Sequence, residues 1–513
     1  MRTWYIFPFI YMICLIWSGC CHKTAHPYIP PDADMLTPAP PAGPRINGPE
    51  ISGVRPGSPF LYRIPCTGER PITFQALNLP EGLMLNENTG IITGSLDNNG
   101  RYKVLLRATN EMGTDSREFT IVAGDTIALT PPMGWNSWYI HYDRVSDSLM
   151  RQAADQMIES GMADFGYQYV NIDDCWMKKA DPGNTDEDNL RDAKGRLTGN
   201  EKFPDMKALA DYIHQKGLKA GLYISPGPTT CAGYAGSYGH ELEDARTFAE
   251  WGFDFLKYDW CSYGRIVNAK TKEDYIRPYQ VMWNHLVEQD RDIVLNLCQY
   301  GMGDVWTWGG EVGNSWRTTG DLGLESDRDL PGFYYIGMSN AEHWTYAHPG
   351  AWNDPDYILI GWVGDAHRMG EGALTGLSHA EQYSYMTMWS LMAAPLIFSG
   401  DMGKLDAFTL NVLCNHEVIA VNQDPLGRQA RVLKKSDKEL LLVKDLADGS
   451  KAFGLFNLTT ESPIMNISAA DLGIEGDFRI RDLWRQKDTG IYTQNFSARV
   501  EPHGVIYARC SGK

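Results

Sequence analysis

Residues 128–425 alternate short apolar runs with amphipathic segments, and this alternation restricts the folds that the chain can adopt. Apolar runs of strand length that are separated by helical patterns predict βα units around a parallel sheet. One amphipathic segment covers residues 147–166; another covers residues 203–217 and ends at Gly217, a typical residue after a helix C-terminus. The expected strands or strand ends are PPMGWNSW, YQYVNIDDCW, LKAGLYIS, FDFLKYDW, DIVLNLCQY, SWRTTGDL, HPGAWNDPD and APLIFSGD.

Eight strand candidates with intervening helices favour a (β/α)8 barrel, the TIM barrel, for this region. An open doubly wound sheet is the alternative, but no G-x-G-x-x-G motif follows a first strand to support it. Residues 45–124 and 430–513 instead carry short strand-like runs separated by turn signals, which are typical of β-sandwiches. The predicted fold class is multidomain: a central (β/α)8 TIM barrel with an N-terminal all-β immunoglobulin-like sandwich and a C-terminal antiparallel β-sandwich.

The N-terminus carries the pattern of an export signal. Residues 1–19 contain a charged end, an apolar stretch and small residues before a cysteine, which resembles a bacterial lipoprotein signal. Cys20 would then be lipidated, and the protein would be held in the bacterial periplasm or on the cell surface. An uncleaved membrane anchor is the alternative, but the stretch is short for a full span. Residues 20–44 are rich in proline and predict an extended tether.

The segment 45–124 resembles the immunoglobulin-like domains of bacterial surface and secreted proteins. It holds no convergent cluster of polar residues, so we interpret it as a spacer, with sugar binding as the alternative. Over the whole chain the formal net charge is −18, which disfavours nucleic acid as a partner. The cysteines show no CxxC and no Cys/His spacing, so we expect no metal site and no cofactor.

Polar residues gather where the expected barrel strands end, which is the end that holds the active site in TIM barrels. The charged residues at the expected strand ends are Asp173 and Asp174, Lys257 and Asp259, Arg317 and Asp321, and Asp354 and Asp356. Trp135 is expected to provide an aromatic floor, and Tyr223, Gln299 and Tyr357 to complete a polar ring. A single strand-end aspartate is more often a helix N-cap or a turn residue. Recurrence at one end of several strands favours a site.

Glycoside hydrolysis is the chemistry that suits this set of residues. It needs two carboxyl groups that flank one bond, with cations and hydroxyl groups to hold the sugar, and it needs no metal or cofactor. A serine hydrolase is excluded because the chain has no G-x-S-x-G motif.

At these residues the sequence resembles glycoside hydrolase family 27, the family of α-galactosidases and α-N-acetylgalactosaminidases. The matching stretches follow the order of the family's barrel, and the first 125 residues lie outside the resemblance. They are TPPMGWNSW (130–138), NIDDCW (171–176), KGLKAGLYIS (216–225), TCAGYAGSYGHELEDARTFAEWGFDFLKYDWC (230–261), SWRTTGDL (315–322), AWNDPDYILIG (351–361) and VIAVNQDPLG (418–427).

The resemblance implies a retaining exo-glycosidase that releases terminal α-D-galactosyl residues from oligo- or polysaccharides. Asp259 would be the nucleophile and Asp321 the general acid/base, with the two carboxyl groups roughly 5 to 5.5 Å apart. Lys257 would keep Asp259 ionised and bind a sugar hydroxyl. The other residues that it implies in substrate binding are Trp135 on the apolar sugar face, Asp173 and Asp174 on the 4- and 6-hydroxyls, and Tyr223, Cys231, Gln299, Arg317 and Asp356. Cys231 and Cys261 would form a disulfide, with two separate thiols as the alternative.

One stretch departs from the family pattern. Many α-galactosidases have Cys-Glu-Trp after the fifth strand, where this chain has Cys298-Gln299-Tyr300. We expect Gln299 to contact the 2-substituent, which argues against an N-acetyl group. The alternative enzymes are a β-L-arabinopyranosidase and an α-N-acetylgalactosaminidase of the same family. The alternative that is not an enzyme is a catalytically silent sugar-binding lipoprotein. Such a protein would be expected to lack Asp259 or Asp321.

Overall fold

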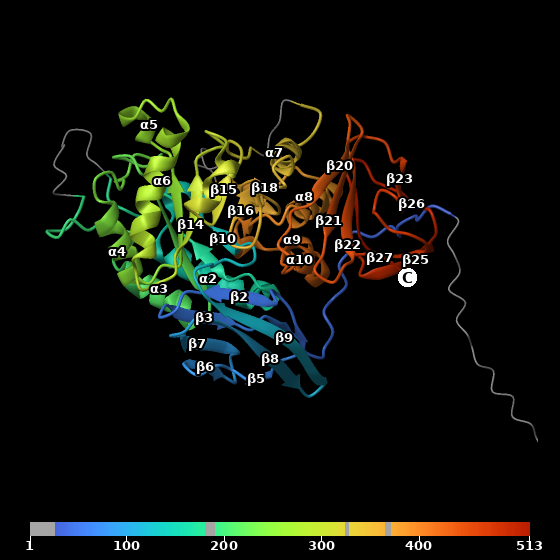
Figure 1. Cartoon of the computed structure of the whole chain (residues 1–513), viewed down its shortest axis with the longest axis horizontal. Helices are drawn as coiled ribbons and strands as arrows, with labels where there is room; N and C mark the ends of the chain where they lie inside the picture. The colour runs from blue at the N-terminus through green and yellow to red at the C-terminus, as the bar shows by residue number, and fades with distance from the viewer. Residues whose placement is uncertain (1–25, 180–189, 324–327, 365–370, 513) are drawn as a thin grey trace, which may run out of the picture.

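The structure is a computed structural model that describes residues 26–179, 190–323, 328–364 and 371–512. The predicted signal segment and Cys20 lie outside the described residues. Figure 1 shows a central barrel with one β-domain beneath it and a second β-domain at its side. No helix among the described residues is long and apolar enough to cross a membrane.

Eight parallel strands form the barrel sheet in the order β16-β15-β14-β13-β12-β11-β10-β19. All eight expected strands are present, and a parallel bridge between Ile358 and Phe398 joins the chain after β16 to β19. The TIM-barrel prediction is confirmed. The strands are β10 (Met133–Asn136), β11 (Tyr169–Asn171), β12 (Lys219–Ile224), β13 (Phe255–Asp259), β14 (Val294–Cys298), β15 (Ser315–Arg317), β16 (Trp352–Asp354) and β19 (Leu396–Phe398).

Helices on the outside of the barrel begin and end at the residues that local chemistry favours. Both predicted helices form. The side chain of Ser146 accepts a hydrogen bond from a first-turn amide of the first helix, and the side chain of Asp205 does the same for the second. Gly217 follows the second helix with a φ of 75°, a left-handed conformation that glycine adopts without steric cost. The α-helices are α1 (Trp138–His141), α2 (Asp147–Glu159), α3 (Met206–Gln215), α4 (Glu241–Trp251), α5 (Tyr263–Ile266), α6 (Lys272–Val287), α7 (Gly332–Ala341), α8 (His379–Leu391), α9 (Ala407–Leu413) and α10 (His416–Asn422). A small hairpin, β17 (Trp362–Val363) and β18 (Ala373–Leu374), lies beside them.

The alternation of side chains along β13 determines what faces the inside of the barrel. Leu256 and Tyr258 belong to the large core cluster that the surrounding helices share. Phe255 instead packs with Ile127, Tyr169 and Val294, an apolar plug where the strands begin. Because side chains alternate along a strand, Lys257 and Asp259 share the interior side with Phe255 and lie progressively nearer the C-terminal end.

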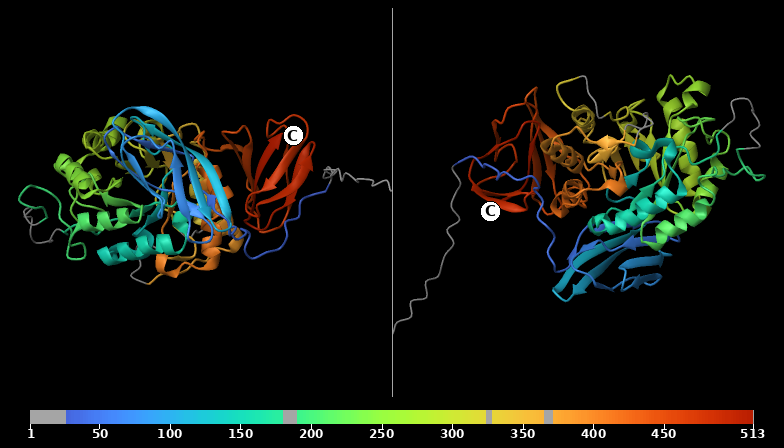
Figure 2. Two further views of the ribbon diagram at one scale, coloured as in Figure 1. Left: turned by 90° about the horizontal axis from the view of Figure 1, so that it is seen from below. Right: turned by 180° about the vertical axis from the view of Figure 1, so that it is seen from behind.

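The N-terminal β-domain packs against the end of the barrel opposite to the strand C-termini (Figures 1 and 2). Its Arg55 forms an ion pair with Asp292 at 2.6 Å and donates to the carbonyl oxygens of three residues that end or follow α6. Arg70 pairs with Asp164 at 2.7 Å. The strands of this domain are β1 (Arg45–Ile46), β2 (Ile51–Val54), β3 (Pro59–Arg63), β4 (Cys66–Thr67), β5 (Thr73–Leu77), β6 (Leu83–Asn86), β7 (Ile91–Ser95), β8 (Gly100–Asn110) and β9 (Gly113–Ala123).

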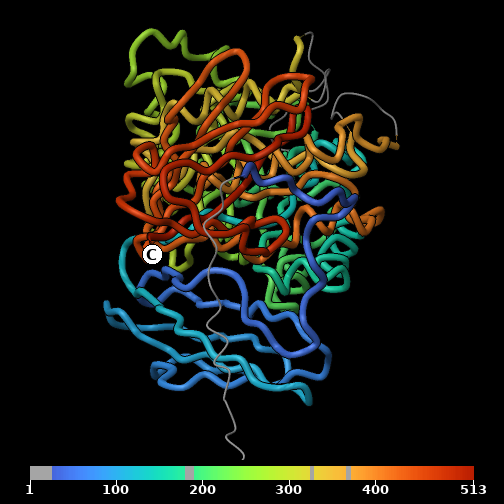
Figure 3. The backbone as a smooth tube through the Cα atoms, turned by 90° about the vertical axis from the view of Figure 1, so that its right-hand side faces the viewer, coloured from blue at the N-terminus to red at the C-terminus, as the bar shows by residue number. Residues whose placement is uncertain are grey.

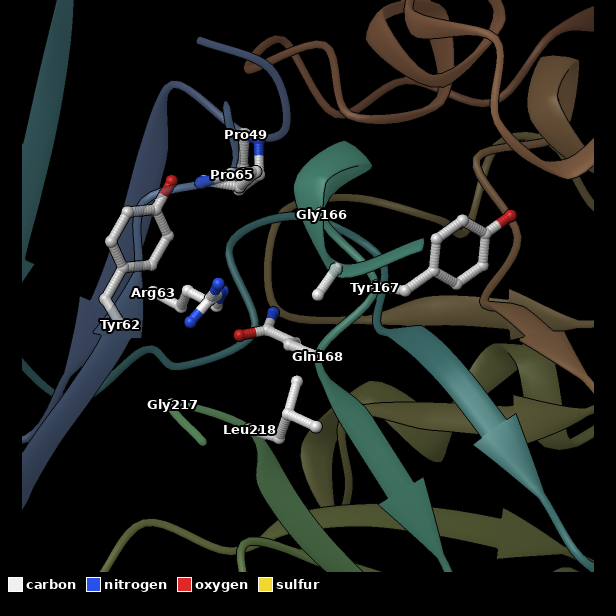
Figure 4. Close-up of a pocket in the computed structure, with 10 residues that line it drawn as sticks. Pro49, Tyr62, Arg63, Pro65, Gly166, Tyr167, Gln168, Gly217 and Leu218 are labelled. Carbon is white, nitrogen blue, oxygen red and sulfur yellow. The ribbon is translucent and has the colours of Figure 1, made fainter. Parts of the chain in front are cut away.

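Figure 4 shows a small hollow between this domain and the start of the barrel strands. Tyr62 and Arg63 line it from the N-terminal domain, and Gln168, Gly217 and Leu218 line it from the barrel. The Tyr62 hydroxyl and the Arg63 Nε are buried without a hydrogen-bond partner among the described residues.

The C-terminal domain pairs six strands in the order β20-β21-β22-β27-β24-β25 and adds the pair β23-β26. One face of its larger sheet packs on the barrel: Leu440 and Leu442 belong to the barrel core, whereas Leu441 and Val443 belong to the core of the sandwich. The strands are β20 (Arg431–Lys435), β21 (Glu439–Asp445), β22 (Lys451–Asn457), β23 (Ile464–Ser468), β24 (Phe478–Asp482), β25 (Lys487–Tyr492), β26 (Asn495–Arg499) and β27 (Val505–Gly512).

The described part of the proline-rich segment is not a free tether. Tyr28 pairs with Ala498 of the C-terminal sandwich, and its hydroxyl donates to Asp482 at 3.0 Å. Thr37 exchanges backbone and side-chain hydrogen bonds with Asn411 on the barrel. The segment therefore runs along the C-terminal sandwich and the barrel before it enters the N-terminal domain (Figure 3), because specific partners hold an otherwise extended chain.

Candidate active site

A pocket of about 440 Å³, a volume that includes its open mouth, lies where the barrel strands end. Most of the strand-end residues identified from the sequence meet here. The described residues that line it are Trp138, Tyr139, Asp173, Tyr223, Cys231, Lys257, Asp259, Tyr300, Arg317, Asp321, Asp356 and Tyr357.

Asp259 is the last residue of β13 and is 5% exposed. Tyr223 of β12 donates its hydroxyl to Asp259 Oδ2 at 3.0 Å, and Tyr300 donates to Oδ1 at 2.6 Å. Both carboxylate oxygens thus accept a hydrogen bond from a phenol, which fixes the plane of the carboxylate in the pocket.

Lys257 forms its ion pair with Asp173, not with Asp259. The distance from Lys257 Nζ to Asp173 Oδ2 is 2.8 Å, and both side chains are buried. Burial alone would lower the pKa of Lys257, but the nearby acidic groups, Asp173 first and Asp259 among them, together outweigh it, and the pKa lies above its ordinary value. Tyr357 also donates to Asp173 Oδ2, at 3.2 Å. Lys257 acts on Asp259 as a nearby positive charge that favours its ionised form, as expected, while its ion pair is with Asp173.

Arg317, the last residue of β15, joins two further carboxylates. Its Nη2 lies 3.0 Å from Asp356 Oδ2, and its Nη1 lies 3.3 Å from Asp321 Oδ1. Asp356 also accepts hydrogen bonds from Tyr139 at 3.0 Å and from the backbone of Leu322 at 2.9 Å. The side chain of Asp321 is 57% exposed, so it lies at the mouth of the pocket, where a departing group could receive a proton.

Burial dominates the electrostatics of the acidic residues in the site. It raises the pKa of Asp259, and the positive charge of Lys257 and the hydrogen bond from Tyr300 oppose this rise. Burial raises the pKa of Asp356 to about 6, against the charge of Arg317, and raises the pKa of Asp174 to about 7. Each ionised carboxylate in this pocket therefore depends on its donors and cations.

The predicted disulfide between Cys231 and Cys261 is present, and Cys231 lines the pocket. It joins the loop after β12 to the turn after β13, and the Ser225 hydroxyl donates to the carbonyl oxygen of Cys261. Although the two sulfur atoms lie near Asp259, bonded sulfurs offer no thiolate, so this group is not a metal site. The described free cysteines are Cys66, Cys175, Cys298, Cys414 and Cys510.

Trp135 does not line the pocket, and Trp138 takes its expected place. The indole of Trp135 is fully buried, and its Nε1 donates to the carbonyl of Gly400 at 2.8 Å. Trp138 begins the short helix beyond β10, and the Lys257 ammonium lies 5.9 Å from its ring centroid. The reason is positional: Trp135 lies within the strand and packs into the core, whereas Trp138 lies past the strand end.

Asp174 and Gln299 also lie outside the residues that line the pocket. Both oxygens of Asp174 accept backbone hydrogen bonds, from Cys175 at 2.7 Å and from Ala232 at 2.9 Å. Gln299 is fully buried and its Nε2 donates to the carbonyl of Met302 at 2.9 Å, so it stabilises the turn after β14. The expected contact of Gln299 with a sugar 2-substituent is not supported.

Sequence reasoning missed three residues that line the pocket: Trp138, Tyr139 and Tyr300. Each follows a strand end by two or three residues. Their position in the sequence could have indicated them, because residues just past the C-terminal end of a parallel strand lie at the same end of the barrel as the active site.

Three family models match the chain. Residues 130–424 match the model described as Alpha galactosidase A, and residues 440–510 match the Alpha galactosidase C-terminal beta sandwich domain. Residues 43–124 match an Ig domain model. These spans correspond to the barrel, the C-terminal sandwich and the N-terminal β-domain.

Relatives and solved structures agree with these matches. Alpha-galactosidase 2 of Arabidopsis thaliana is 36% identical over 394 residues, which are 76% of this chain and 91% of the relative. The structure of a proposed alpha-galactosidase/melibiase from Bacteroides fragilis NCTC 9343 is 37% identical, with a TM-score of 0.84 over 93% of this chain and 99% of that chain. Alpha-galactosidase I from Mortierella vinacea is 30% identical, with a TM-score of 0.68 over 76% of this chain and 99% of that chain.

Proposed function

The chain belongs to glycoside hydrolase family 27, the α-galactosidase family, and from this premise we propose how its pocket releases terminal α-D-galactosyl residues. The reaction is a double displacement at the anomeric carbon that retains configuration. One observation carries the proposal: Asp259, at the end of β13, and Asp321, after β15, line the same pocket. A sugar-binding protein without catalytic activity would not need both carboxyl groups.

In the first step, a carboxylate oxygen of Asp259 attacks the anomeric carbon, and the bond from that carbon to the leaving oxygen breaks. Asp321 gives its proton to the leaving oxygen, so the departing sugar leaves as a neutral alcohol. In the second step, Asp321 takes a proton from water while the water oxygen attacks the same carbon. Asp259 then leaves as a carboxylate, and both groups return to their starting charge.

The remaining lining residues would hold the sugar. Lys257 and Asp173, as a buried pair, offer a donor and acceptors for adjacent hydroxyl groups. Arg317 and Asp356 offer the same combination on the other side. Trp138 offers an aromatic surface for the apolar face of the ring.

The two catalytic roles can be separated by stereochemistry. We expect Asp259→Ala to lose about 10³-fold or more in kcat while it keeps the thermal stability of the native protein. In azide, this variant should form β-galactosyl azide from an activated α-galactoside, because azide then attacks directly and inverts. Asp321→Ala should form α-galactosyl azide, because the covalent intermediate still forms.

Asp211→Ala is the matched control, because it removes an exposed aspartate of α3 that pairs with Lys207 at 2.8 Å on the surface of the same helix. Its kcat should match that of the native protein. The opposite pair of azide anomers, or an active Asp259→Ala, would reject the assignment of roles.

The choice of sugar is tested by comparing kcat/KM for p-nitrophenyl α-galactoside, β-L-arabinopyranoside and α-N-acetylgalactosaminide. We expect the α-galactoside to be the best substrate of the three. A higher kcat/KM for the arabinopyranoside would instead place the enzyme with the alternative specificity of the same family.

We also propose that Cys20 anchors the protein to a membrane by a lipid. The proposal is supported by the signal-like residues 1–19, which end immediately before Cys20. Tyr28, eight residues after Cys20, lies on the C-terminal sandwich. Because an extended residue spans about 3.5 Å, the sandwich side would lie within about 30 Å of the lipid. Cys20→Ala should abolish the incorporation of labelled palmitate into the protein; unchanged labelling would refute lipidation at Cys20.

A further inference from the structure

Tyr300 makes the shortest contact with the proposed nucleophile among the described residues. Its hydroxyl lies 2.6 Å from Asp259 Oδ1, compared with 3.0 Å from Tyr223 to Oδ2. The family resemblance assigns no role to this residue, since the family pattern has tryptophan at its place in the sequence. An indole has no hydroxyl group, so the contact of Tyr300 with Asp259 is a feature of this chain that needs its own explanation.

The two tyrosines reach Asp259 from elements of different kinds. Tyr223 lies within β12 and is paired in register with Lys257 of β13, so the sheet fixes it. Tyr300 lies in the turn after β14 with a φ of 66°, a conformation that costs a non-glycine residue energy. Such backbone strain persists only where the surrounding structure holds it.

Gln299 provides part of that support. The carbonyl oxygen of Gln299 accepts from the backbone of Met302 at 3.3 Å, and its side chain donates to the carbonyl of Met302 at 2.9 Å. Gly301 and Gly303 follow with φ values of 85° and 64°, which their lack of a side chain permits. The turn is thus built to direct the phenol of Tyr300 into the pocket.

The Tyr300 hydroxyl lies between Asp259 and the disulfide. It is 3.9 Å from the sulfur atoms of both Cys231 and Cys261, which leaves the carboxylate as its strong acceptor. Burial raises the pKa of Tyr300, and the nearby negative charges add to this rise, so the hydroxyl keeps its proton and remains a donor.

We propose that Tyr300 is a positioning residue that holds Asp259 charged and oriented in the free enzyme. The proposal rests on the proposed role of Asp259 as the nucleophile. A carboxylate has about four lone-pair sites, so two phenol donors leave sites free for attack on the sugar. The phenol stabilises the charged form without adding a positive charge of its own, in a pocket where Lys257 is already paired with Asp173.

Other groups also face Asp259 and contribute to its ionisation. Lys257 favours the charged form, whereas Asp321 and Asp173 disfavour it. The titratable groups around it are Asp173 after β11, Tyr223 of β12, Lys257 of β13, Tyr279 of α6, Cys298 of β14, Tyr300 after β14 and Asp321 after β15. Tyr300→Phe leaves each of the others in place, so it isolates the contribution of one hydroxyl group.

The test is the pH dependence of kcat/KM for p-nitrophenyl α-galactoside, whose acidic limb reports the ionisation of the free enzyme. Because loss of a donor raises the pKa of a carboxyl group, the acidic limb of Tyr300→Phe should move to higher pH by about one unit. Tyr300→Leu, which removes the ring as well, should move the limb by the same amount. Tyr346→Phe, at an exposed tyrosine that does not line the pocket, should leave the limb in place.

An acidic limb that stays in place in both Tyr300 variants would overturn the proposal, as would an equal loss of kcat/KM at every pH together with a lower Tm. That second result would show a role in packing alone. Failure of the nucleophile assignment is recognised separately, by the anomer of the azide product from Asp259→Ala.

Discussion

Asp259 and Lys257 occupy alternate positions of β13, so both side chains enter the barrel interior, yet they do not pair with each other. The lysine pairs with Asp173 from the next strand but one, and two tyrosines bind the aspartate. At the scale of single residues, the strand pattern determines which side chains reach the site. Their partners come from other strands.

The two tryptophans of the GWNSW motif test this distinction. Trp138→Ala should raise KM by roughly tenfold with only a small change in Tm, because it removes a surface that faces the pocket. Trp135→Ala should lower the free energy of unfolding by about 3–5 kcal/mol, because it leaves a cavity in the core. Steady-state kinetics and thermal unfolding of the two variants check this, and the reverse pattern would contradict the placement.

At the scale of elements, β21 shows how one strand serves two cores and carries an unexpected charge. Leu440 and Leu442 face the barrel, and Lys444 continues the same side of the strand. Its Nζ is buried and has no hydrogen-bond partner among the described residues. Burial lowers the pKa of Lys444 to about 7, although the charge of Asp424 opposes this.

This lysine should make stability depend on pH. Between about pH 7 and 10.5 the unfolded chain binds a proton at Lys444 that the folded chain does not, so stability rises with pH across that window. Lys444→Met should therefore raise the Tm. We expect the free energy of unfolding to increase by roughly 1–4 kcal/mol at pH 6.5 and by less at pH 9.5. Thermal unfolding at both pH values measures this.

The exposed Lys438, in the turn before β21, gives the control: Lys438→Met should change the Tm little at either pH. An equal gain of stability at both pH values for Lys444→Met would contradict the buried-lysine argument.

At the scale of the whole molecule, the three domains form a single packed arrangement with the pocket at one end of the barrel (Figure 1). The N-terminal domain binds the opposite end through Arg55 and Arg70, so it does not contribute to the pocket. The segment around Tyr28 and Thr37 fastens the start of the described chain to the C-terminal sandwich and the barrel. The N-terminal domain therefore provides none of the described residues that line the pocket.

The sequence by itself determined the barrel, its eight strands and the acids at their ends, because these depend on local periodicity. A strand of alternating side chains directs Lys257 and Asp259 inward whatever surrounds it, and Gly217 ends its helix through its own backbone freedom. The disulfide was reached through family resemblance, since spacing alone left other pairings open.

Only the tertiary structure decided which side chains meet. Trp138 in place of Trp135, Asp173 as the partner of Lys257, and Tyr300 in place of Gln299 depend on the directions in which residues leave strand ends, and on neighbours far away in the chain. Contacts of this kind have no local signature, because they form between residues whose spacing in sequence is set by intervening helices and loops.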